Sequence, residues 1–226
     1  MKPLLITIDG PAGAGKTTIS QQLAQRLGYR YIDTGALYRA VALAALEAGL
    51  SATADEGLSQ LLPTLELRFE RKGPDLVLLL NERDVSAEIR SPEVSMMASA
   101  VSARPIVRKF LLNFQQHLGR QKSMVFEGRD MGTVVFPDAD VKIYLDADPQ
   151  ERARRRHLQL GGKQAPQSLN QVAQEMQQRD ANDATRPVAP LKPAPDAHII
   201  DSSRLSIAGV IDRIVVCIEA STAQSS

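Results

Sequence analysis

The chain has 226 residues, of which 43% are hydrophobic, and this is enough to bury a full core in one large or two small domains. Its 27 Lys and Arg residues nearly balance its 26 Asp and Glu residues, which argues against nucleic acid or a membrane surface as a partner. We expect a cytoplasmic protein, because no run of about 18 apolar residues is present, the N-terminus lacks a charged leader, and the single cysteine, Cys217, cannot form an internal disulfide.

A glycine-rich loop stands near the start of the chain. An apolar run at residues 4–8 predicts a short strand, and residues 10–17 behind it fit the pattern GxxxxGK[ST]. Apolar residues then recur at helical spacing, and Gly28 supplies a C-terminal stop. The bare pattern also describes a turn that merely joins a strand to a helix. The order of strand, loop and helix favours a nucleoside triphosphate site, because glycines let backbone N–H groups turn around an anion at the positive end of a helix.

The loop residues predict both the donor site and its metal ion. We expect Lys16 to reach the β and γ phosphates of a nucleoside triphosphate and the Thr17 hydroxyl to bind Mg²⁺, with Thr18 as the alternative metal ligand. Mg²⁺ that accompanies ATP is the expected cofactor. The predicted ATP-binding residues are Gly10, Pro11, Ala12, Gly13, Ala14, Gly15, Lys16, Thr17 and Thr18.

Five short apolar runs predict the strands of a parallel sheet, at residues 4–8, 29–32, 124–126, 141–145 and 198–200. Helix-like segments alternate with them, so the predicted fold class is α/β, a doubly wound three-layer fold with a five-stranded parallel sheet. Ligands in such folds gather at the carboxyl ends of the strands, where this chain carries acidic residues.

These strand ends are not equivalent. Asp146 and Asp201 are followed by helix-start and turn residues, and we interpret them as structural caps or turn formers. The other strand ends carry Asp9, Asp33-Thr34-Gly35 and Glu127-Gly128-Arg129-Asp130.

Residues 65–80 interrupt this α/β rhythm. Residues 65–69 alternate with a period of two, residues 72–75 predict a turn, and residues 76–80 are apolar, so we predict an antiparallel hairpin with a short third strand near residues 84–85. The hairpin is an insertion between the second and third parallel strands. It is either a decorative flap or part of a mobile subdomain that binds the phosphoryl acceptor.

An arginine-rich segment follows the fourth predicted strand. Arg152, Arg154, Arg155 and Arg156 precede a Gly161-Gly162 break, a polar helix is predicted at residues 169–178, and Arg179 and Arg186 come after it. Most arginine runs are solvated helix faces. This one is joined to a glycine hinge and a second helix, which favours a lid that brings guanidinium groups over transferring phosphates.

Four stretches together resemble bacterial cytidylate kinase, and the resemblance runs from about residue 4 to about residue 218. They are residues 8–16 (IDGPAGAGK), residues 33–39 (DTGALYR), residues 128–139 (GRDMGTVVFPDA), and Arg179-Asp180 with Asp183 and Arg186. The resemblance implies a P-loop kinase fold and transfer of the γ-phosphoryl group of ATP to CMP or dCMP, giving the diphosphate and ADP. It implies a core of residues 1–34, 105–150 and 187–220, a monophosphate-binding subdomain with the inserted hairpin at residues 35–104, and a helical lid at residues 151–186.

The resemblance also implies roles for single residues. Substrate-binding residues would be Thr34, Arg39, Ser99, Arg108, Arg129, Asp130, Arg179, Asp183 and Arg186. Among them, Arg39, Arg129 and Arg186 would hold the 5′-phosphate, since a guanidinium fork matches phosphate oxygens. Ser99, Arg108 and Asp130 would recognise cytosine. Arg179 and Asp183 would contact the sugar. Taken singly, Arg39 and Arg108 also fit the surface ends of apolar helices, and Asp183 fits a helix cap.

Catalysis on this interpretation is positioning and charge stabilisation. The catalytic residues would be Lys16, Arg129, Arg152, Arg156 and Arg179. Glu127 would help to hold Mg²⁺, with Asp9 competing for that role. No general base is required because the acceptor phosphate is already an anion, and His117, His157 and His198 fit no triad or metal spacing.

Two rival functions stay open at this point. Another small-molecule kinase would keep the loop and lid but carry different base-reading residues. A nucleotide-dependent switch would typically carry an NKxD signature, which the sequence lacks. We expect a monomer whose partners are the small molecules ATP and CMP or dCMP, with neither nucleic acid nor membrane involved. The tail at residues 221–226 is expected to be disordered.

Overall fold

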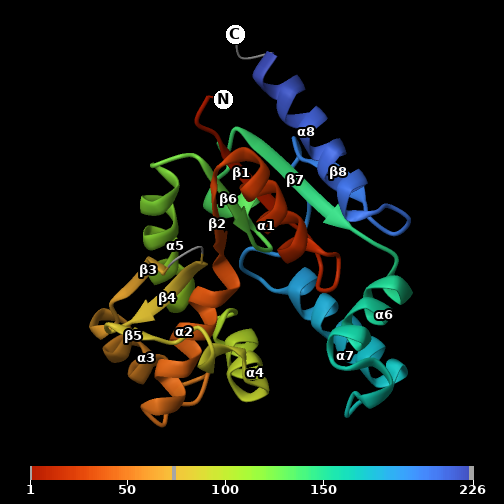
Figure 1. Cartoon of the computed structure of the whole chain (residues 1–226). Helices are drawn as coiled ribbons and strands as arrows, with labels where there is room; N and C mark the ends of the chain where they lie inside the picture. The colour runs from red at the N-terminus through yellow and green to blue at the C-terminus, as the bar shows by residue number, and fades with distance from the viewer. Residues whose placement is uncertain (1, 73–74, 224–226) are drawn as a thin grey trace. The chain divides into compact units, whose positions relative to one another are not determined.

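The computed structural model describes residues 2–72 and 75–223 of the chain. Its central sheet has five strands, and their order across the sheet is β2-β6-β1-β7-β8 (Figure 1). The strands are β1 (Leu5–Asp9), β2 (Arg30–Asp33), β6 (Met124–Glu127), β7 (Val141–Asp146) and β8 (His198–Asp201). Each begins and ends within one residue of its predicted position, so the predicted α/β fold is confirmed.

Burial and register explain why the polar strand ends meet. Every residue of β1 and β6 is buried, as expected of strands covered on both faces. Parallel pairing sets Ile8 of β1 opposite Glu127 of β6 and opposite Ile143 of β7. The residues that follow these three strands therefore share one edge of the sheet.

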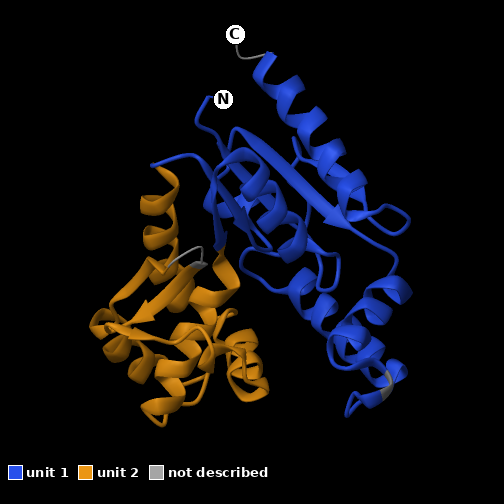
Figure 2. Ribbon diagram, in the orientation of Figure 1, with its two compact units in different colours: residues 1–32, 121–226 blue, residues 33–120 orange. Residues whose placement is uncertain are grey.

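Contacts within the chain divide it into two compact units, residues 1–32 with 121–226 (unit 1) and residues 33–120 (unit 2) (Figure 2). In unit 1, α1 (Lys16–Leu27) packs on β1 and β6, and α8 (Ile207–Ala223) packs on β7 and β8. The two helices also contact each other, so they share one face of the sheet. Apolar side chains from these elements form the core of unit 1, among them Leu23 and Ile143.

The predicted lid belongs to unit 1. It consists of α6 (Pro149–Gln159), a 3-10 turn η4 (Gly162–Gln164) and α7 (Leu169–Thr185). Asp148 caps α6, and its side chain accepts hydrogen bonds from the backbone N–H groups of Gln150 and Glu151. A capping box formed by Ser168 and Gln171 starts α7. The two helices pack on each other around a small separate core of Ala153, Val172 and Met176.

Unit 2 is built around α2 (Thr34–Glu47), a helix so rich in small and apolar residues that most of it is buried. It packs against α4 (Pro92–Val101), α5 (Pro105–Gly119) and β4. The remaining elements are α3 (Asp55–Leu61), the 3-10 turns η1 (Leu62–Thr64) and η2 (Glu88–Arg90), and an antiparallel sheet ordered β3-β4-β5. Its strands are β3 (Leu67–Lys72), β4 (Asp75–Leu80) and β5 (Arg83–Asp84), which confirms the inserted hairpin. The turn itself, at residues 73–74, lies outside the described residues.

Some boundaries differ from the sequence-based ones. The polar helix predicted to end at residue 178 continues to Thr185, so Arg179 and Asp183 lie within α7 rather than after it. Residues 221–223, expected to be disordered, complete α8, and residues 224–226 lie outside the described part of the chain. Division by contacts places α5 with unit 2.

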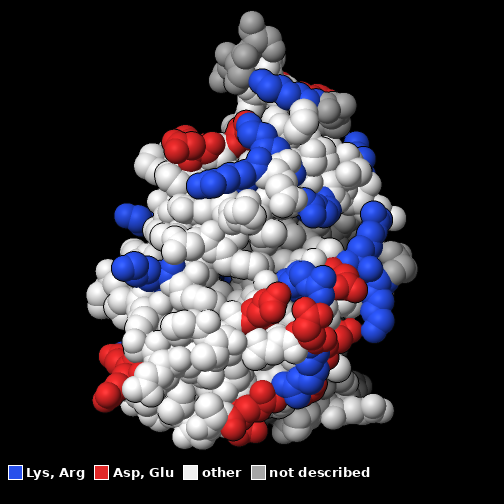
Figure 3. Space-filling view, turned by 90° about the vertical axis from the view of Figure 1, so that its left-hand side faces the viewer, with Lys and Arg blue, Asp and Glu red and all other residues white. Residues whose placement is uncertain are grey.

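On the face shown in Figure 3, basic and acidic side chains are interspersed and no broad field of one sign forms. Among the residues that the structure describes, no helix has the length and apolar character needed to cross a membrane. Within the same residues, no group of three or more His, Cys, Asp or Glu side chains is arranged to hold a metal ion.

Candidate active site

The loop between β1 and α1 depends on glycine at its first position. Gly10 has a φ of 146°, and a Cβ atom built there would lie 2.0 Å from the carbonyl oxygen of Leu145. Gly15 is in the left-handed region with a φ of 92°, and α1 begins at the next residue. The first N–H groups of α1 therefore face the loop without partners in the helix, which is the arrangement that binds phosphate.

Lys16 is buried at the centre of this loop. Its Nζ atom donates a hydrogen bond to the carbonyl oxygen of Pro11 at 2.7 Å. Burial, together with repulsion by Arg129 and a smaller effect from Arg179, lowers the pKa of Lys16 to about 7, although Glu127 and Asp9 oppose the shift. These three predicted catalytic residues are thus within electrostatic reach of one another in unit 1.

Two of the predicted metal ligands meet beside the loop. The Thr17 hydroxyl donates to Oε1 of Glu127 at 2.9 Å, and the Tyr31 hydroxyl donates to Oε2 at 2.5 Å. Hydroxyl and carboxylate oxygens are the ligands that Mg²⁺ prefers, so this donor set fits the expected cofactor. Among the described residues, the Thr18 hydroxyl is paired with no carboxylate. The geometry favours Thr17 over Thr18.

The Asp9 carboxylate binds backbone N–H groups rather than the hydroxyls beside the loop. Its two carboxylate oxygens accept hydrogen bonds from the backbone N–H groups of Met131, at 2.9 Å, and Gly132, at 2.7 Å. Burial raises the pKa of Asp9 to about 6, although both hydrogen bonds oppose the shift. Asp9 therefore anchors the π-helical turn η3 (Met131–Val135) that follows Asp130, and Glu127 is the better metal candidate.

Four predicted acceptor residues form two ion pairs in unit 1. Arg129 follows β6, and its Nε atom donates to Asp183 of α7 at 3.0 Å. Arg186 donates from Nη2 to Oδ1 of Asp130 at 3.2 Å, and the two side chains are only 8% and 4% exposed. Unit 1 thus brings together the charged groups on the segment after β6 and on the end of α7.

Of the other predicted acceptor residues, Arg179 lies on α7 in unit 1, and Thr34, Arg39, Ser99 and Arg108 lie in unit 2. Asp33 caps α2 by accepting from the N–H of Ala36, and it also accepts from Nη2 of Arg39 at 2.7 Å. Thr34 is buried in the first turn of α2. Arg108 of α5 is buried, and its guanidinium lies 5.7 Å from the centre of the Tyr38 ring.

Ser99 differs from these buried groups. It lies on α4 with an exposed side chain, and its backbone carbonyl accepts from the Ser102 hydroxyl. Local packing therefore does not hold the Ser99 side chain in a fixed position for its predicted contact with the base.

The two predicted catalytic arginines of α6 occupy different environments. Arg156 of α6 is exposed. Arg152 is 7% exposed, and its guanidinium donates to the carbonyl oxygens of Ala147 and Ala12 at 3.0 and 3.1 Å and also to Asp180. Arg152 thus lies against the glycine-rich loop in this structure.

Several residues without a role predicted from the sequence lie at the site in the structure. Tyr31 holds Glu127, Asp33 holds Arg39, and Asp180 holds Arg152. Ser202, which follows β8, and Arg155 of α6 adjoin the loop. Asp33 and Asp180 stand inside motifs that were recognised, so a search for a carboxylate near each arginine would have found them. Tyr31 and Ser202 carry no sequence signal, because their partners are far away in the chain.

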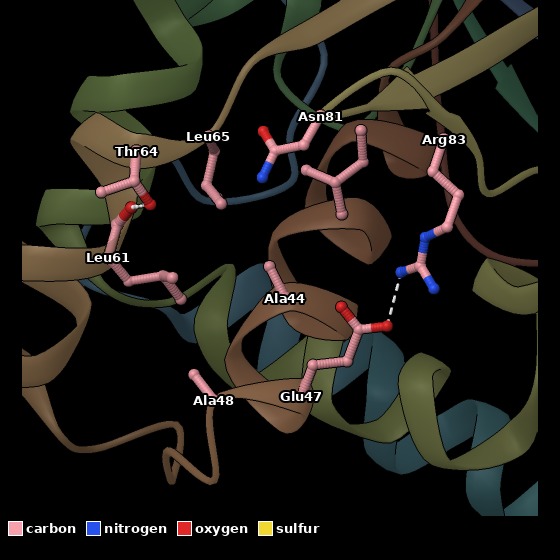
Figure 4. A pocket seen from close by; sticks show the side chains of 9 residues that line it. Ala44, Glu47, Ala48, Leu61, Thr64, Leu65, Asn81 and Arg83 are labelled. Atoms are coloured by element: carbon pink, nitrogen blue, oxygen red, sulfur yellow. Dashed lines mark hydrogen bonds and ion pairs between the residues drawn. The ribbon is translucent and has the colours of Figure 1, made fainter.

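A hollow of about 430 Å³ in unit 2 lies apart from these groups (Figure 4). Its walls come from α2, from the turn after α3 and from the hairpin, and Glu47 and Arg83 form an ion pair at its rim. None of its nine lining residues belongs to the predicted site.

Comparisons with known proteins identify the family. The family model for cytidylate kinase matches residues 6–220. The cytidylate kinase of Syntrophotalea carbinolica is 48% identical over 214 residues, which cover 95% of this chain and 91% of that protein. The cytidylate kinase of Solibacter usitatus is 49% identical over 216 residues, with 95% and 91% covered.

Solved structures show a likeness of fold alone. An uncharacterized protein from Eubacterium ventriosum has a TM-score of 0.55 at 12% identity, with 96% of this chain and 98% of that chain covered. A gluconokinase from Sinorhizobium meliloti has a TM-score of 0.50 at 13% identity, with 96% and 93% covered. The match to the family model spans nearly the whole chain, and the relatives are matched over nearly their whole length. The chain belongs to the cytidylate kinase family.

Proposed function

We propose that this chain transfers the γ-phosphoryl group of ATP to CMP or dCMP, giving ADP with CDP or dCDP. The observation that carries the proposal is the buried pair of Arg186 and Asp130, 3.2 Å apart in unit 1. A buried guanidinium and a buried carboxylate side by side offer one group for a phosphate and one for a base with an amino substituent. Membership of the cytidylate kinase family supports the same activity.

The base is proposed to be selected by Asp130. Its carboxylate accepts from the exocyclic 4-amino group of cytosine, while Ser99 and Arg108 contact the remaining polar edge. Uracil presents a carbonyl oxygen where Asp130 needs a donor. A buried carboxylate that faces an acceptor stays unpaired, and this disfavours UMP strongly.

The phosphates are held by cations and backbone N–H groups. Lys16 and the loop bind the β and γ phosphates of ATP, and Arg39, Arg129 and Arg186 hold the acceptor phosphate in line with them. Arg152, Arg156 and Arg179 complete the predicted set that stabilises charge on the transferring group. Thr17 and Glu127 would hold Mg²⁺, which neutralises charge on the phosphate oxygens when bound. The acceptor phosphate is itself the nucleophile, so no side chain has to remove a proton.

The domain roles follow from this assignment. The core carries ATP, the segment 35–104 binds the monophosphate, and the segment 151–186 is the lid. We propose that the enzyme works as a cytoplasmic monomer on these small molecules.

A coupled assay of ADP release tests the proposal across CMP, dCMP, UMP, AMP and shikimate. We expect turnover with CMP and dCMP, and a kcat/KM for UMP at least about 100-fold lower, as a site that rejects a substrate by leaving a buried polar group unpaired predicts. Equal rates with UMP and CMP contradict the cytosine assignment. ATP binding without transfer to any acceptor supports a nucleotide-dependent switch instead.

Asp130→Asn sharpens this test, because the amide can donate to the uracil carbonyl. The ratio of CMP to UMP turnover should fall in this variant. Asp138→Asn is the matched control, since Asp138 is exposed in the same segment and should leave the ratio unchanged.

A further inference from the structure

Side chains donate hydrogen bonds to three carbonyl groups of the glycine-rich loop, and two of these side chains come from outside the loop. Lys16 donates to the carbonyl oxygen of Pro11 at 2.7 Å, Arg152 to that of Ala12 at 3.1 Å, and the Ser202 hydroxyl to that of Ala14 at 3.0 Å. Lys16 belongs to the known motif. Arg152 reaches the loop from α6 and Ser202 from the residues that follow β8.

Holding a carbonyl also fixes the next N–H group. A peptide unit is planar, and no cis bond occurs in the described chain, so each C=O points opposite to the N–H of the following residue. The bond to Ala12 therefore sets the direction of the Gly13 N–H, and the bond to Ala14 sets that of Gly15. Glycines at positive φ can rotate these planes easily, and the outside contacts remove that freedom.

The hydrogen bond from Arg152 to the carbonyl oxygen of Ala12 is itself held in place by Asp180. Arg152 donates from Nε to the carbonyl oxygen of Ala147 at 3.0 Å, and its Nη1 atom pairs with Oδ2 of Asp180 on α7. The Arg152 side chain is 9% exposed, so the carboxylate supplies charge compensation that water cannot. Packing reinforces the contact, because a Cβ atom on Gly13 would lie 2.7 Å from Cε of Met176.

Arg155 fixes the direction of the hydrogen bond from the Ser202 hydroxyl to the carbonyl oxygen of Ala14. The Arg155 guanidinium donates from Nη1 to the Ser202 hydroxyl at 3.0 Å and from Nη2 to the Ser202 carbonyl at 2.7 Å. A guanidinium cannot accept a hydrogen bond, so the single hydroxyl proton of Ser202 is left for Ala14. Ser202 is 3% exposed, and water does not compete for this proton.

We propose that Asp180, acting through Arg152, and Ser202, directed by Arg155, are positioning residues that preset the loop N–H groups of Gly13 and Gly15 for the phosphates of ATP. The proposal deepens the proposed function, on which it rests only for the use of ATP as donor. The competing explanation is that these contacts merely fasten α6, α7 and the end of β8 to the core. That role would lower stability without selecting one substrate.

The deciding measurement is the Kd of a non-hydrolysable ATP analogue with Mg²⁺, determined by calorimetry without acceptor. Ser202→Ala and Asp180→Ala are each expected to weaken binding about ten-fold to one hundred-fold, because hydrogen bonds to a charged phosphate are lost or misaligned. The KM for CMP should stay within about three-fold of the wild-type value.

Two control variants are matched to Ser202→Ala and Asp180→Ala. Ser221→Ala removes a hydroxyl that donates to Cys217 within α8, and Asn182→Ala removes an exposed side chain of α7 that accepts from Gln178. Both should leave the Kd of the analogue unchanged. Urea unfolding of each variant verifies that it is folded. If Asp180→Ala does not fold, Asp180→Asn, which keeps an oxygen for Arg152 but loses the charge, takes its place beside Ser202→Ala.

Unchanged analogue affinity in the folded variants overturns the proposal, and so does a KM for CMP that rises by the same factor as the Kd of the analogue. Failure of the proposed function is separable from either outcome. In that case the wild-type protein binds the analogue but transfers nothing to CMP, and the Kd series still decides the role of Asp180 and Ser202.

Discussion

At the scale of single residues, Asp9 connects the donor loop to the segment that carries Asp130. Its carboxylate is buried, and its pKa is raised to about 6 from 3.8. The folded state therefore binds the proton more tightly than the unfolded state does. This group's contribution to stability is fully present below about pH 3.8 and is lost as the pH rises through about 6, so at neutral pH the buried charge is a cost.

Asp9→Asn tests this linkage. The variant cannot titrate, so the wild-type protein should gain stability over it as the pH falls from about 6 to about 4. The difference should approach about 3 kcal/mol, at 1.36 kcal/mol per pKa unit. Urea unfolding of both proteins at several pH values measures it. A difference that stays constant over this range would contradict the raised pKa.

Thr17 and Thr18 offer adjacent hydroxyls, and only Thr17 is hydrogen-bonded to Glu127. We expect Thr17→Ala to lower kcat/KM for Mg·ATP about ten-fold and to raise the Mg²⁺ concentration needed for half-maximal rate, since one oxygen ligand is lost. Thr18→Ala should change both values less than about three-fold. The opposite order of effects in a Mg²⁺ titration would assign the metal to Thr18.

Residue roles were predictable where chemistry and spacing coincide in one short stretch. The loop from Gly10 to Thr17 and the stop at Gly28 are of this kind, and both lie where the sequence predicted them. Tyr31 and Ser202 were missed because their functional partners, Glu127 and Ala14, lie 96 and 188 positions away. Only the pairing of strands brings such groups together, and a single sequence does not record it.

At the scale of elements, the turn from β1 into the loop leaves no room for a side chain. Gly10→Ala would place a Cβ atom 2.0 Å from the carbonyl oxygen of Leu145 in β7. We expect it to lower the free energy of unfolding by about 3 kcal/mol or more and to abolish ATP binding.

Gly28→Ala is the matched substitution, at the C-terminal end of α1. Gly28 also has a positive φ, of 68°, but no atom lies within 4 Å of the added Cβ. The cost should be about 1 kcal/mol, from backbone strain alone. Thermal or urea unfolding compares the two variants, and equal losses would show that strain rather than the clash dominates at Gly10.

Strands were predictable to within one residue because each is a short apolar run bounded by polar residues. The end of α7 was not. The sequence from Arg179 to Arg186 contains no glycine or proline, and the first residue that breaks a helix is Pro187. The predicted helix ends at residue 178, whereas the residues of this stretch continue it to Thr185 and present Asp180 and Asp183 one turn apart.

At the scale of the whole molecule, the proposed enzyme must avoid transferring phosphate to water. Acceptor and donor are proposed to close their own segments, so chemistry should begin only when both are bound. We expect ADP release without CMP to be at least about 100-fold slower than with saturating CMP. The coupled assay measures both rates. Rapid hydrolysis without an acceptor would contradict closure by substrate.

The arginines proposed to hold the acceptor phosphate each have an aspartate partner within their own unit. The pairs are Arg39 with Asp33, Arg129 with Asp183, and Arg186 with Asp130. A phosphate that binds there exchanges one anion for another, so the free energy gained is the difference between two charge-assisted pairs. When the product dissociates, each guanidinium can pair again with the aspartate of its own unit. On this proposal, the carboxylates should shorten the residence time of the diphosphate, which would favour repeated turnover over tight retention of product.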